Sequence, residues 1–237
     1  MKSNIIKVFC LAALMFGIGS SVNAQFRQSV FLNGGIPTGQ FAKAVSDNHT
    51  TVPLYHTDIA KAATPGFGLG YRVSYRFDVG VGEVAPFANV DLFWNFMGDG
   101  WSDTYIQAHS SAPNYFNIPL VLGVSYFYDE LWNDITPYGE FGVGADLFII
   151  GSEKSEYFVH KYAYKPTISM AWMIGAGAYF GRHVSAGIYY YGLGKHTIEY
   201  TSKTVSDFTT VEQVAYEGSD VETRTLGQLA LRIGFHF

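Results

Sequence analysis

The sequence has little charge and almost no cysteine. Asp, Glu, Lys and Arg together make up 15% of the 237 residues, whereas soluble domains usually carry about a quarter. A single cysteine excludes a disulfide framework and a cysteine-cluster metal site. The formal net charge of −5 gives no reason to expect nucleic acid as a partner.

The chain is rich in aromatic residues and glycine instead of charged residues. The chain has 19 Phe, 17 Tyr and 26 Gly, yet its mean hydropathy is only +0.09. So many aromatic side chains argue against a disordered chain. Length alone permits one large domain or two small ones.

The first 24 residues have the layout of a secretory signal peptide. Lys2 and Lys7 form a basic start, residues 8–18 are an apolar run, and residues 22–24 supply small side chains at a cleavage position. The apolar run is shorter than the roughly 20 residues that a membrane-spanning helix needs. We therefore expect residues 1–24 to be removed and residues 25–237 to form one domain.

Beyond residue 24, apolar side chains alternate with small or polar ones at every second position, which is typical of strands. At the C-terminus, Leu231, Ile233 and Phe235 alternate with Arg232 and Gly234. The same pattern, less regular in places, predicts eight strands at residues 26–35, 67–77, 85–96, 116–128, 138–147, 168–180, 183–192 and 229–237. Each segment is close to the 9–11 residues of a tilted membrane-spanning strand.

The two faces of these segments indicate what surrounds the sheet. One face is aromatic and aliphatic, and the other carries mostly Gly, Ala and Ser with isolated charges. The small-residue face suits the crowded interior of an eight-stranded barrel, and the apolar face suits lipid. Because hydrocarbon does not tolerate an open sheet edge, the sheet must close.

The lengths of the connections give an independent check on this topology. Residues 36–65, 98–114, 149–167 and 193–225 are long polar connections, whereas residues 78–84, 129–135 and 181–182 are short. Long loops that alternate with short periplasmic turns are typical of bacterial outer-membrane barrels. The sequence thus predicts an all-β fold, an eight-stranded antiparallel transmembrane β-barrel with four long extracellular loops, in the cell outer membrane.

A resemblance to a known family rests on five segments. They are residues 34–41 (GGIPTGQF), 115–120 (YFNIPL), 137–144 (PYGEFGVG), 174–177 (IGAG) and the terminal Phe237. With them the chain resembles the outer membrane protein β-barrel domain family common in Bacteroidetes, a group related in architecture to OmpA-like and OmpX-like barrels that includes PorT-like members. The resemblance implies the same barrel fold. It also implies that Phe237 is the signal read by the outer-membrane insertion machinery.

Inward-facing charges are the first candidates for a functional site. The face assignment directs seven charged side chains into the lumen: Arg27, Arg72, Arg76, Asp91, Glu140, Asp146 and Arg232. Buried charges persist only when they are paired and hydrogen-bonded, and an eight-stranded barrel encloses little more than side chains. We therefore expect a structural ion-pair network that plugs the lumen, with a selectivity path for ions as the alternative.

Histidine offers two further candidates, the His-x-Ser pairs at residues 109–111 and 183–185. A nucleophilic serine needs an adjacent base that a third group holds in place. Neither pair has such a setting, because His109 lies in a loop while His183 and Ser185 turn inward near the periplasmic end. The loop histidines, at positions 49, 56, 160 and 196, are too scattered for a metal site. We expect no enzyme, no metal and no cofactor.

The loops and strand ends carry the remaining signals. Alternating stretches at residues 197–201 and 209–214 can extend two strands outward as a hairpin, whose edges offer a partner strand a pairing surface. The four tryptophans, Trp94, Trp101, Trp132 and Trp172, fall mostly near strand ends, as in the aromatic girdles of membrane barrels.

These observations favour a non-enzymatic outer-membrane barrel that supports the envelope or binds partners through its extracellular loops. The expected partners are outer-membrane lipid and lipopolysaccharide, the insertion machinery, and an envelope or secretion protein. Three alternatives stay open at this point: a PorT-like accessory of protein secretion or envelope assembly, a lipid-modifying enzyme, and a narrow ion channel.

Overall fold

The computed structural model describes residues 26–43, 62–98, 110–111, 113–128, 134–151, 153–155, 159–205, 214–216 and 222–237. The predicted signal peptide, residues 1–24, lies outside this part of the chain, as do His49, His56, His109, Trp101 and Trp132. No helix in the described ranges is long and apolar enough to cross a bilayer.

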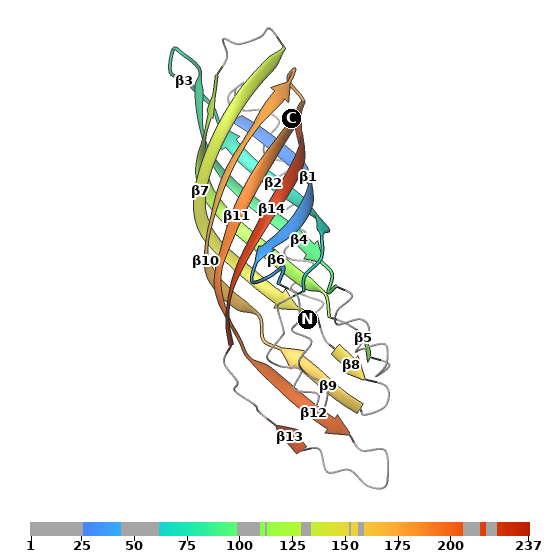
Figure 1. The fold of residues 1–237 in the computed structure, drawn as a ribbon. Helices are drawn as coiled ribbons and strands as arrows, with labels where there is room; N and C mark the ends of the chain where they lie inside the picture. Colours follow the sequence, from blue (N-terminus) through green and yellow to red (C-terminus); the bar gives the residue numbers. More distant parts are fainter. Residues whose placement is uncertain are drawn as a thin grey trace.

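Eight long strands form a barrel in the described residues (Figure 1). They are β1 (Phe26–Gly39), β2 (Gly66–Tyr75), β4 (Glu83–Asn95), β6 (Tyr115–Phe127), β7 (Ile135–Ile150), β10 (Thr167–Phe180), β11 (Val184–Ile198) and β14 (Glu222–His236). All pairs are antiparallel, in the order β2-β1-β14-β11-β10-β7-β6-β4, and the pairing of β2 with β4 closes the ring. The predicted eight-stranded antiparallel barrel is therefore confirmed.

The side chains alternate between the two faces of the wall as the sequence predicts. On β6, for example, Leu120, Leu122 and Val124 are exposed, whereas Asn117 and Val121 are completely buried. Similar exposed apolar side chains, among them Ile168, Ile188 and Leu231, lie on the other strands and surround the barrel. A continuous belt of this kind is far larger than the apolar patches of soluble monomers, and it is the surface that a membrane-spanning barrel presents to lipid.

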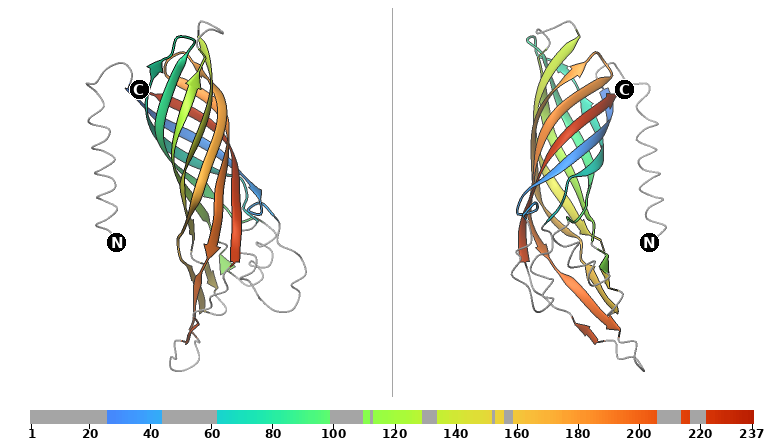
Figure 2. Two further views of the ribbon diagram at one scale, coloured as in Figure 1. Left: turned by 90° about the vertical axis from the view of Figure 1, so that its left-hand side faces the viewer. Right: turned by 45° about the vertical axis from the view of Figure 1, so that its right-hand side comes forward.

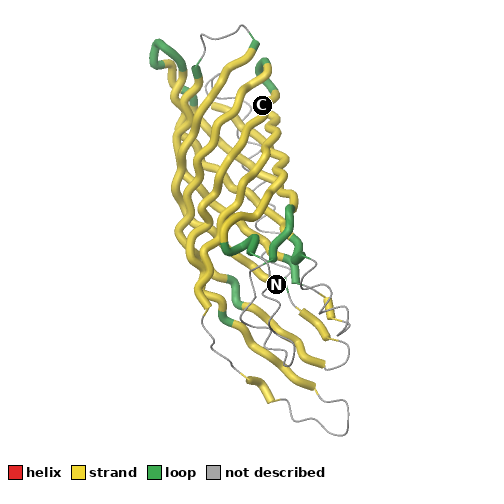
Figure 3. Tube along the Cα trace, viewed as in Figure 1, coloured by secondary structure: helices red, strands yellow, loops and turns green. Residues whose placement is uncertain are grey.

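The two ends of the barrel differ. At one end, which we call the turn end, lie the short turn at residues 181–183 and the two-residue strand β3 (Phe77–Asp78), which pairs with β4. The C-terminus lies at this end as well (Figures 1 and 2). The opposite end, which we call the loop end, carries the long connections, and the coil segments are confined to the two ends of the strands (Figure 3).

A second, smaller sheet projects from the loop end on one side of the barrel (Figures 1 and 2). Its strands are β5 (Ser110–Ser111), β8 (Glu153–Ser155), β9 (Val159–Tyr164), β12 (Tyr200–Val205) and β13 (Val214–Tyr216), in the order β13-β12-β9-β8-β5. β8 follows β7, β9 precedes β10 and β12 follows β11 in the chain. The small sheet therefore continues the wall formed by these three barrel strands.

The barrel strands at this side are longer than the alternation predicts. β11 runs on to Ile198 and β14 begins at Glu222, so part of the predicted 193–225 loop is paired strand. A bulge between Gly192 and Gly194 separates this extension from the rest of β11. Gly194 has a φ of +82°, a conformation that glycine adopts without strain. The bulge interrupts the alternation, which is why the pattern in the sequence ends near residue 192.

Candidate functional site in the barrel lumen

The lumen is filled with side chains in successive layers from the turn end to the loop end. Two of these layers are buried ion pairs, and both are formed by residues that the sequence analysis places in the lumen. The first joins Arg72 on β2 to Glu140 on β7, with Nη1 and Nη2 donating to the two carboxylate oxygens at 2.7 and 2.6 Å. Ser125 on β6 donates a further hydrogen bond to Glu140 at 2.9 Å. The Arg72 guanidinium also stacks over Phe87, 4.1 Å from the ring centroid.

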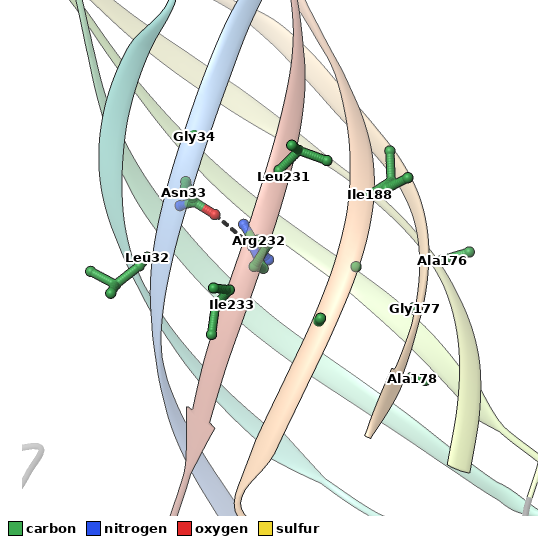
Figure 4. Close-up of a pocket in the computed structure, with 12 residues that line it drawn as sticks. Leu32, Asn33, Gly34, Ala176, Gly177, Ala178, Ile188, Leu231, Arg232 and Ile233 are labelled. Atoms are coloured by element: carbon green, nitrogen blue, oxygen red, sulfur yellow. Dashed lines mark hydrogen bonds between the residues drawn. The ribbon is translucent and has the colours of Figure 1, made fainter. Parts of the chain in front are cut away.

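The second ion pair joins Arg232 on β14 to Asp91 on β4. Arg232 Nη2 lies 2.8 Å from both oxygens of Asp91, and its Nε donates to Asn33 at 2.9 Å (Figure 4). Tyr191 donates to Asp91 at 2.8 Å. Phe31 lies between the two ion pairs, because its ring contacts the guanidinium of Arg232 at 4.3 Å and that of Arg72 at 5.1 Å. Both charged layers are thus compensated, as buried charges require.

The other three predicted members of the network lie elsewhere in the lumen. Arg76 pairs with Glu83 at the turn end, at 2.7 Å. Arg27 lies at the same end and donates to the backbone carbonyl of Arg182 at 3.3 Å. Asp146 lies towards the loop end beside His196, with 3.2 Å between Oδ2 and Nε2. Asn89 joins the two central ion pairs, because it accepts from Nε of Arg72 at 3.4 Å and donates to Asp91. Four of the seven side chains, Arg72, Glu140, Asp91 and Arg232, therefore belong to one hydrogen-bonded network, whereas the other three make the separate contacts given above.

Glu83 and His196 are partners that the sequence reasoning missed. The alternation places Glu83 in a short turn, although it is the first residue of β4. It also places His196 in a loop, but the extension of β11 past the bulge brings this residue inside the barrel, fully buried. The continued alternation beyond Gly194 is the signal that could have found it.

The turn end of the lumen is closed by an aromatic layer around His236. Tyr179 stacks on His236 with 4.2 Å between the ring centroids, and Tyr138 packs edge-on against Tyr179 at 5.4 Å. Arg76 lies over Phe127, 4.0 Å from its ring centroid. Together these groups cover the two ion pairs from this side.

The serine–histidine contact at the turn end is not the predicted pair. Ser185 is buried, but its partner is His236, whose Nε2 lies 2.8 Å from the serine Oγ. His183 lies in the exposed turn before β11, so its predicted inward position is wrong, because the strand begins one residue later. The other nitrogen of His236 contacts Ser29 at 2.7 Å and Tyr179 at 3.2 Å. A hydroxyl therefore occupies the place that a carboxylate takes in a hydrolytic triad.

The loop end is covered by an apolar layer of Phe41, Tyr115, Phe148, Ile198 and Leu226, all nearly or completely buried. Phe41 follows the first strand and lies edge-on to Tyr115 at 5.4 Å and to Phe148 at 6.0 Å. We call these five residues the apolar lid. Lid, ion pairs and aromatic layer fill the described lumen from end to end.

Glycines on the inner face make room for the large lumenal side chains. A Cβ atom at Gly175 would collide with the ring of Tyr189, and one at Gly177 would lie 2.6 Å from the hydroxyl of Tyr138. On the outer face of the same wall, small residues leave a shallow apolar depression of about 730 Å³ beside Leu231 and Ile233 (Figure 4). These two side chains point away from Arg232, which shows the alternation directly (Figure 4).

Phe237 follows β14 at the turn end. Its side chain is 72% exposed, while its backbone exchanges two hydrogen bonds with Gln28, at 2.9 and 3.3 Å. The terminal aromatic ring therefore lies on the outer surface of the closed seam between β1 and β14.

Comparison with known proteins identifies the fold and no closer relationship. No family model and no curated protein matches the chain, so membership of the Bacteroidetes-type family stays a prediction. Among solved structures, a major outer membrane protein from Thermus thermophilus matches with a TM-score of 0.50 and 14% identity, over 90% of this chain and 99% of that one.

Two other solved structures are similar over 90% of this chain. Neisserial surface protein A matches at 10% identity with a TM-score of 0.49, over 97% of its length. OprG from Pseudomonas aeruginosa matches at 12% identity with a TM-score of 0.43, over 95% of its length. At these identities the likeness concerns the fold, and the chain has the closed eight-stranded fold of small outer-membrane β-barrels.

Proposed function

We propose that the protein is a non-enzymatic, integral outer-membrane barrel that binds a partner protein at the cell surface through the small sheet at its loop end. In this orientation the turn end faces the periplasm and the loop end faces the outside, as in bacterial barrels with short periplasmic turns. The exposed apolar belt supports the membrane position.

The small sheet is the observation on which the binding proposal rests. It has two terminal strands, β5 and β13, each paired on one side within the described residues. A terminal strand presents unpaired backbone groups that can accept another strand. An extended segment of a partner protein added to such an edge gains main-chain hydrogen bonds, which is a common mode of peptide recognition.

A deletion in the small sheet tests this proposal. Removal of residues 200–215 takes away β12 and most of the terminal strand β13, and it should leave the barrel folded, because the barrel strands pair with one another without them. Cross-linked partners would be recovered from intact outer membranes of cells with the full-length and the shortened protein. We expect the partner to be lost. A deletion of equal length, residues 46–61, removes part of the first long connection and serves as the control.

The filled lumen supports a closed barrel rather than a channel. The layered side chains leave the two ion pairs fully or almost fully buried, and the lid covers the loop end. Conductance in planar bilayers measures this directly. We expect no steady single-channel current from the wild type; a steady, ion-selective current would contradict the closed lumen and favour the channel alternative.

The serine–histidine contact supports a structural rather than a catalytic role. Ser185 and His236 are 1% and 2% exposed, so a substrate cannot reach the serine without opening of the barrel. Mass spectrometry of lipid A from cells with and without the protein checks this point. We expect identical lipid A, whereas a change in acylation that a Ser185→Ala variant abolishes would show an enzyme.

A further inference from the structure

The small sheet at the loop end brings three lysines into one row. Lys161 on β9 pairs in register with Lys154 on β8 at one side and with Lys203 on β12 at the other. Directly opposed residues of an antiparallel pair share a face of the sheet, with their Cβ atoms about 4.5–5.5 Å apart. The three lysines therefore cross three neighbouring strands on a single face. We call them the lysine row.

Like charges directly opposite each other destabilise a sheet, and the positions around the lysine row carry no acid. The row ends at Ser111 on β5 and at Ala215 on β13. The neighbours of the row on the same face of β9 and β12 are Val159, Ala163, Thr201 and Val205. Glu153 pairs with Tyr162 and so belongs to the other face. On this face of the described sheet, the counter-charge of the row must therefore come from outside the sheet.

The lysine row belongs to the outer face of the small sheet. Tyr164, at the end of β9, packs against the buried core, whereas its neighbour Ala163 is exposed. The register of β9 with β12 is continuous from Val159 to Tyr164, so Lys161 shares the face of Ala163. The small sheet continues the barrel wall on one side (Figure 2). The row is therefore part of the outer surface, beyond the apolar belt.

Two further lysines lie between the row and the belt. Lys195 on β11 is exposed. Lys165, which follows β9, is also exposed and binds Glu199 at 2.8 Å. On β10 the belt begins at Ile168 and Met170, which are 74% and 73% exposed. Because a strand rises about 3.3 Å per residue, Lys161 lies about 13 Å farther from the belt than Lys165, measured along the chain. The basic surface therefore starts at the edge of the belt and extends away from it.

We propose that the lysine row, with Lys165 and Lys195 below it, binds the phosphate groups of lipopolysaccharide in the outer leaflet around the barrel. Lysine binds phosphate as a point charge, and a bound phosphate offsets the repulsion within the row. A basic surface that begins at the edge of the belt fits an anion that the membrane holds beside the barrel. The inference rests on the outward orientation of the loop end proposed above, but not on the partner protein, which binds the sheet edges.

The test measures how much lipopolysaccharide the barrel retains. The full-length protein is folded into phosphatidylcholine vesicles that contain either bisphosphorylated lipopolysaccharide or the same preparation after removal of its phosphates with hydrofluoric acid. After extraction into an uncharged detergent and size exclusion, the hydroxy fatty acids that remain with each barrel are quantified. We expect the phosphorylated form to be retained and the dephosphorylated form to be retained at least tenfold less. Equal retention of the two forms, or retention of neither, would overturn the proposal.

Substitutions in the lysine row locate the binding surface. The triple variant Lys154→Gln, Lys161→Gln and Lys203→Gln should reduce retention of the phosphorylated form at least fivefold. Lys161→Arg keeps the charge and should retain as much as the wild type. Lys43→Gln is the matched control, because Lys43 is an exposed lysine at the loop end that follows β1 and lies outside the small sheet. Unchanged retention in the triple variant, or an equal loss in Lys43→Gln, would overturn the assignment to the row.

Urea titration of the same variants separates binding from folding. Without lipopolysaccharide, the triple variant should have the same unfolding midpoint as the wild type or a higher one, because two like-charge pairs are removed. A lower midpoint would show that the lysines stabilise the sheet itself and would overturn the proposal. The vesicles carry lipopolysaccharide in both leaflets and contain no partner protein. Failure of the proposed cell-surface function would therefore leave the retention result unchanged.

Discussion

Arg232 and Asp91 form a fully buried ion pair across the lumen, with Nη2 of the arginine 2.8 Å from both carboxylate oxygens. The pair connects β14, the last strand, to β4, and Asn33 from β1 donates to the same carboxylate at 3.0 Å. It therefore ties both strands of the β1–β14 seam to β4, with β2 between β1 and β4 in the wall. Removal of one partner leaves the other charge buried and uncompensated.

We expect Asp91→Asn to lower the free energy of unfolding by about 3–5 kcal/mol, the usual cost of breaking a buried pair. Urea titration in detergent, followed by tryptophan fluorescence, measures this change. Asp78→Asn is the control, because Asp78 is exposed at the turn end and its Oδ1 accepts a hydrogen bond from the backbone of Gly80. An equally small effect of both substitutions would show that the buried pair does not contribute to stability.

The pair of Arg72 and Glu140 allows a graded comparison. Glu140→Ala should destabilise the barrel by several kcal/mol, since Arg72 is then left without its bidentate partner. Ser125→Ala removes one hydrogen bond to the same carboxylate and should cost about 1 kcal/mol. The variants are ranked by their urea midpoints and by partner recovery on cells. A loss of partner binding without loss of stability in Glu140→Ala would overturn the structural interpretation of this pair.

The alternation of side chains predicts much of the fold and part of the lumen. It directs Arg72, Glu140, Asp91 and Arg232 inward because a strand turns every second side chain to the same face. It does not predict which inward charges meet, because partners come from strands far apart in the sequence and depend on the register of every pair between them. Arg72 and Glu140, for example, are separated by 68 positions.

Irregular positions are the ones that sequence reasoning misses. The bulge at Gly192 and Gly194 hides the strand that carries His196. Phe41 follows a turn after Gly39, so no periodicity marks it as a member of the lid, although it is completely buried. At His183 the alternation predicts the start of the strand one residue too early. In each case a local departure from period two decides where the side chain lies.

A charged side chain on the lipid-facing surface of the barrel should impair folding into a membrane. Leu231 is 53% exposed on the outer face of β14, so Leu231→Arg places a charge in hydrocarbon, at a cost of about 2–4 kcal/mol near the bilayer midplane. Folding into vesicles, read from the shift in gel mobility between heated and unheated samples, should fall. Thr223→Arg, an exposed site at the loop end of the same strand, should fold normally. Normal folding of Leu231→Arg would show that the face is wrongly assigned.

A substitution at Phe237 should affect assembly in the cell and the stability of the folded barrel differently. Its ring is exposed and its backbone, rather than its side chain, binds Gln28. Phe237→Ala should therefore change the free energy of unfolding of the refolded barrel by about 0.5 kcal/mol or less, yet reduce the amount of barrel assembled in outer membranes if the insertion machinery reads this residue. Membrane fractionation and urea titration measure the two effects. A normal amount in the membrane would contradict the assembly role that the resemblance implies.

Gly175 and Tyr189 provide the final prediction, on the packing of the lumen. A side chain at Gly175 would meet the tyrosine ring, which lies against the backbone there, so Gly175→Val should destabilise the barrel by about 1–3 kcal/mol through overpacking. Ala176→Val, the next residue on the exposed outer face, should have little effect because it extends into lipid. The double variant Gly175→Val with Tyr189→Leu should recover part of the loss, since the smaller side chain vacates the space. If the double variant is no more stable than Gly175→Val, the loss of stability comes from the strand backbone rather than from contact with Tyr189. The need for glycine at position 175 would then not be due to Tyr189.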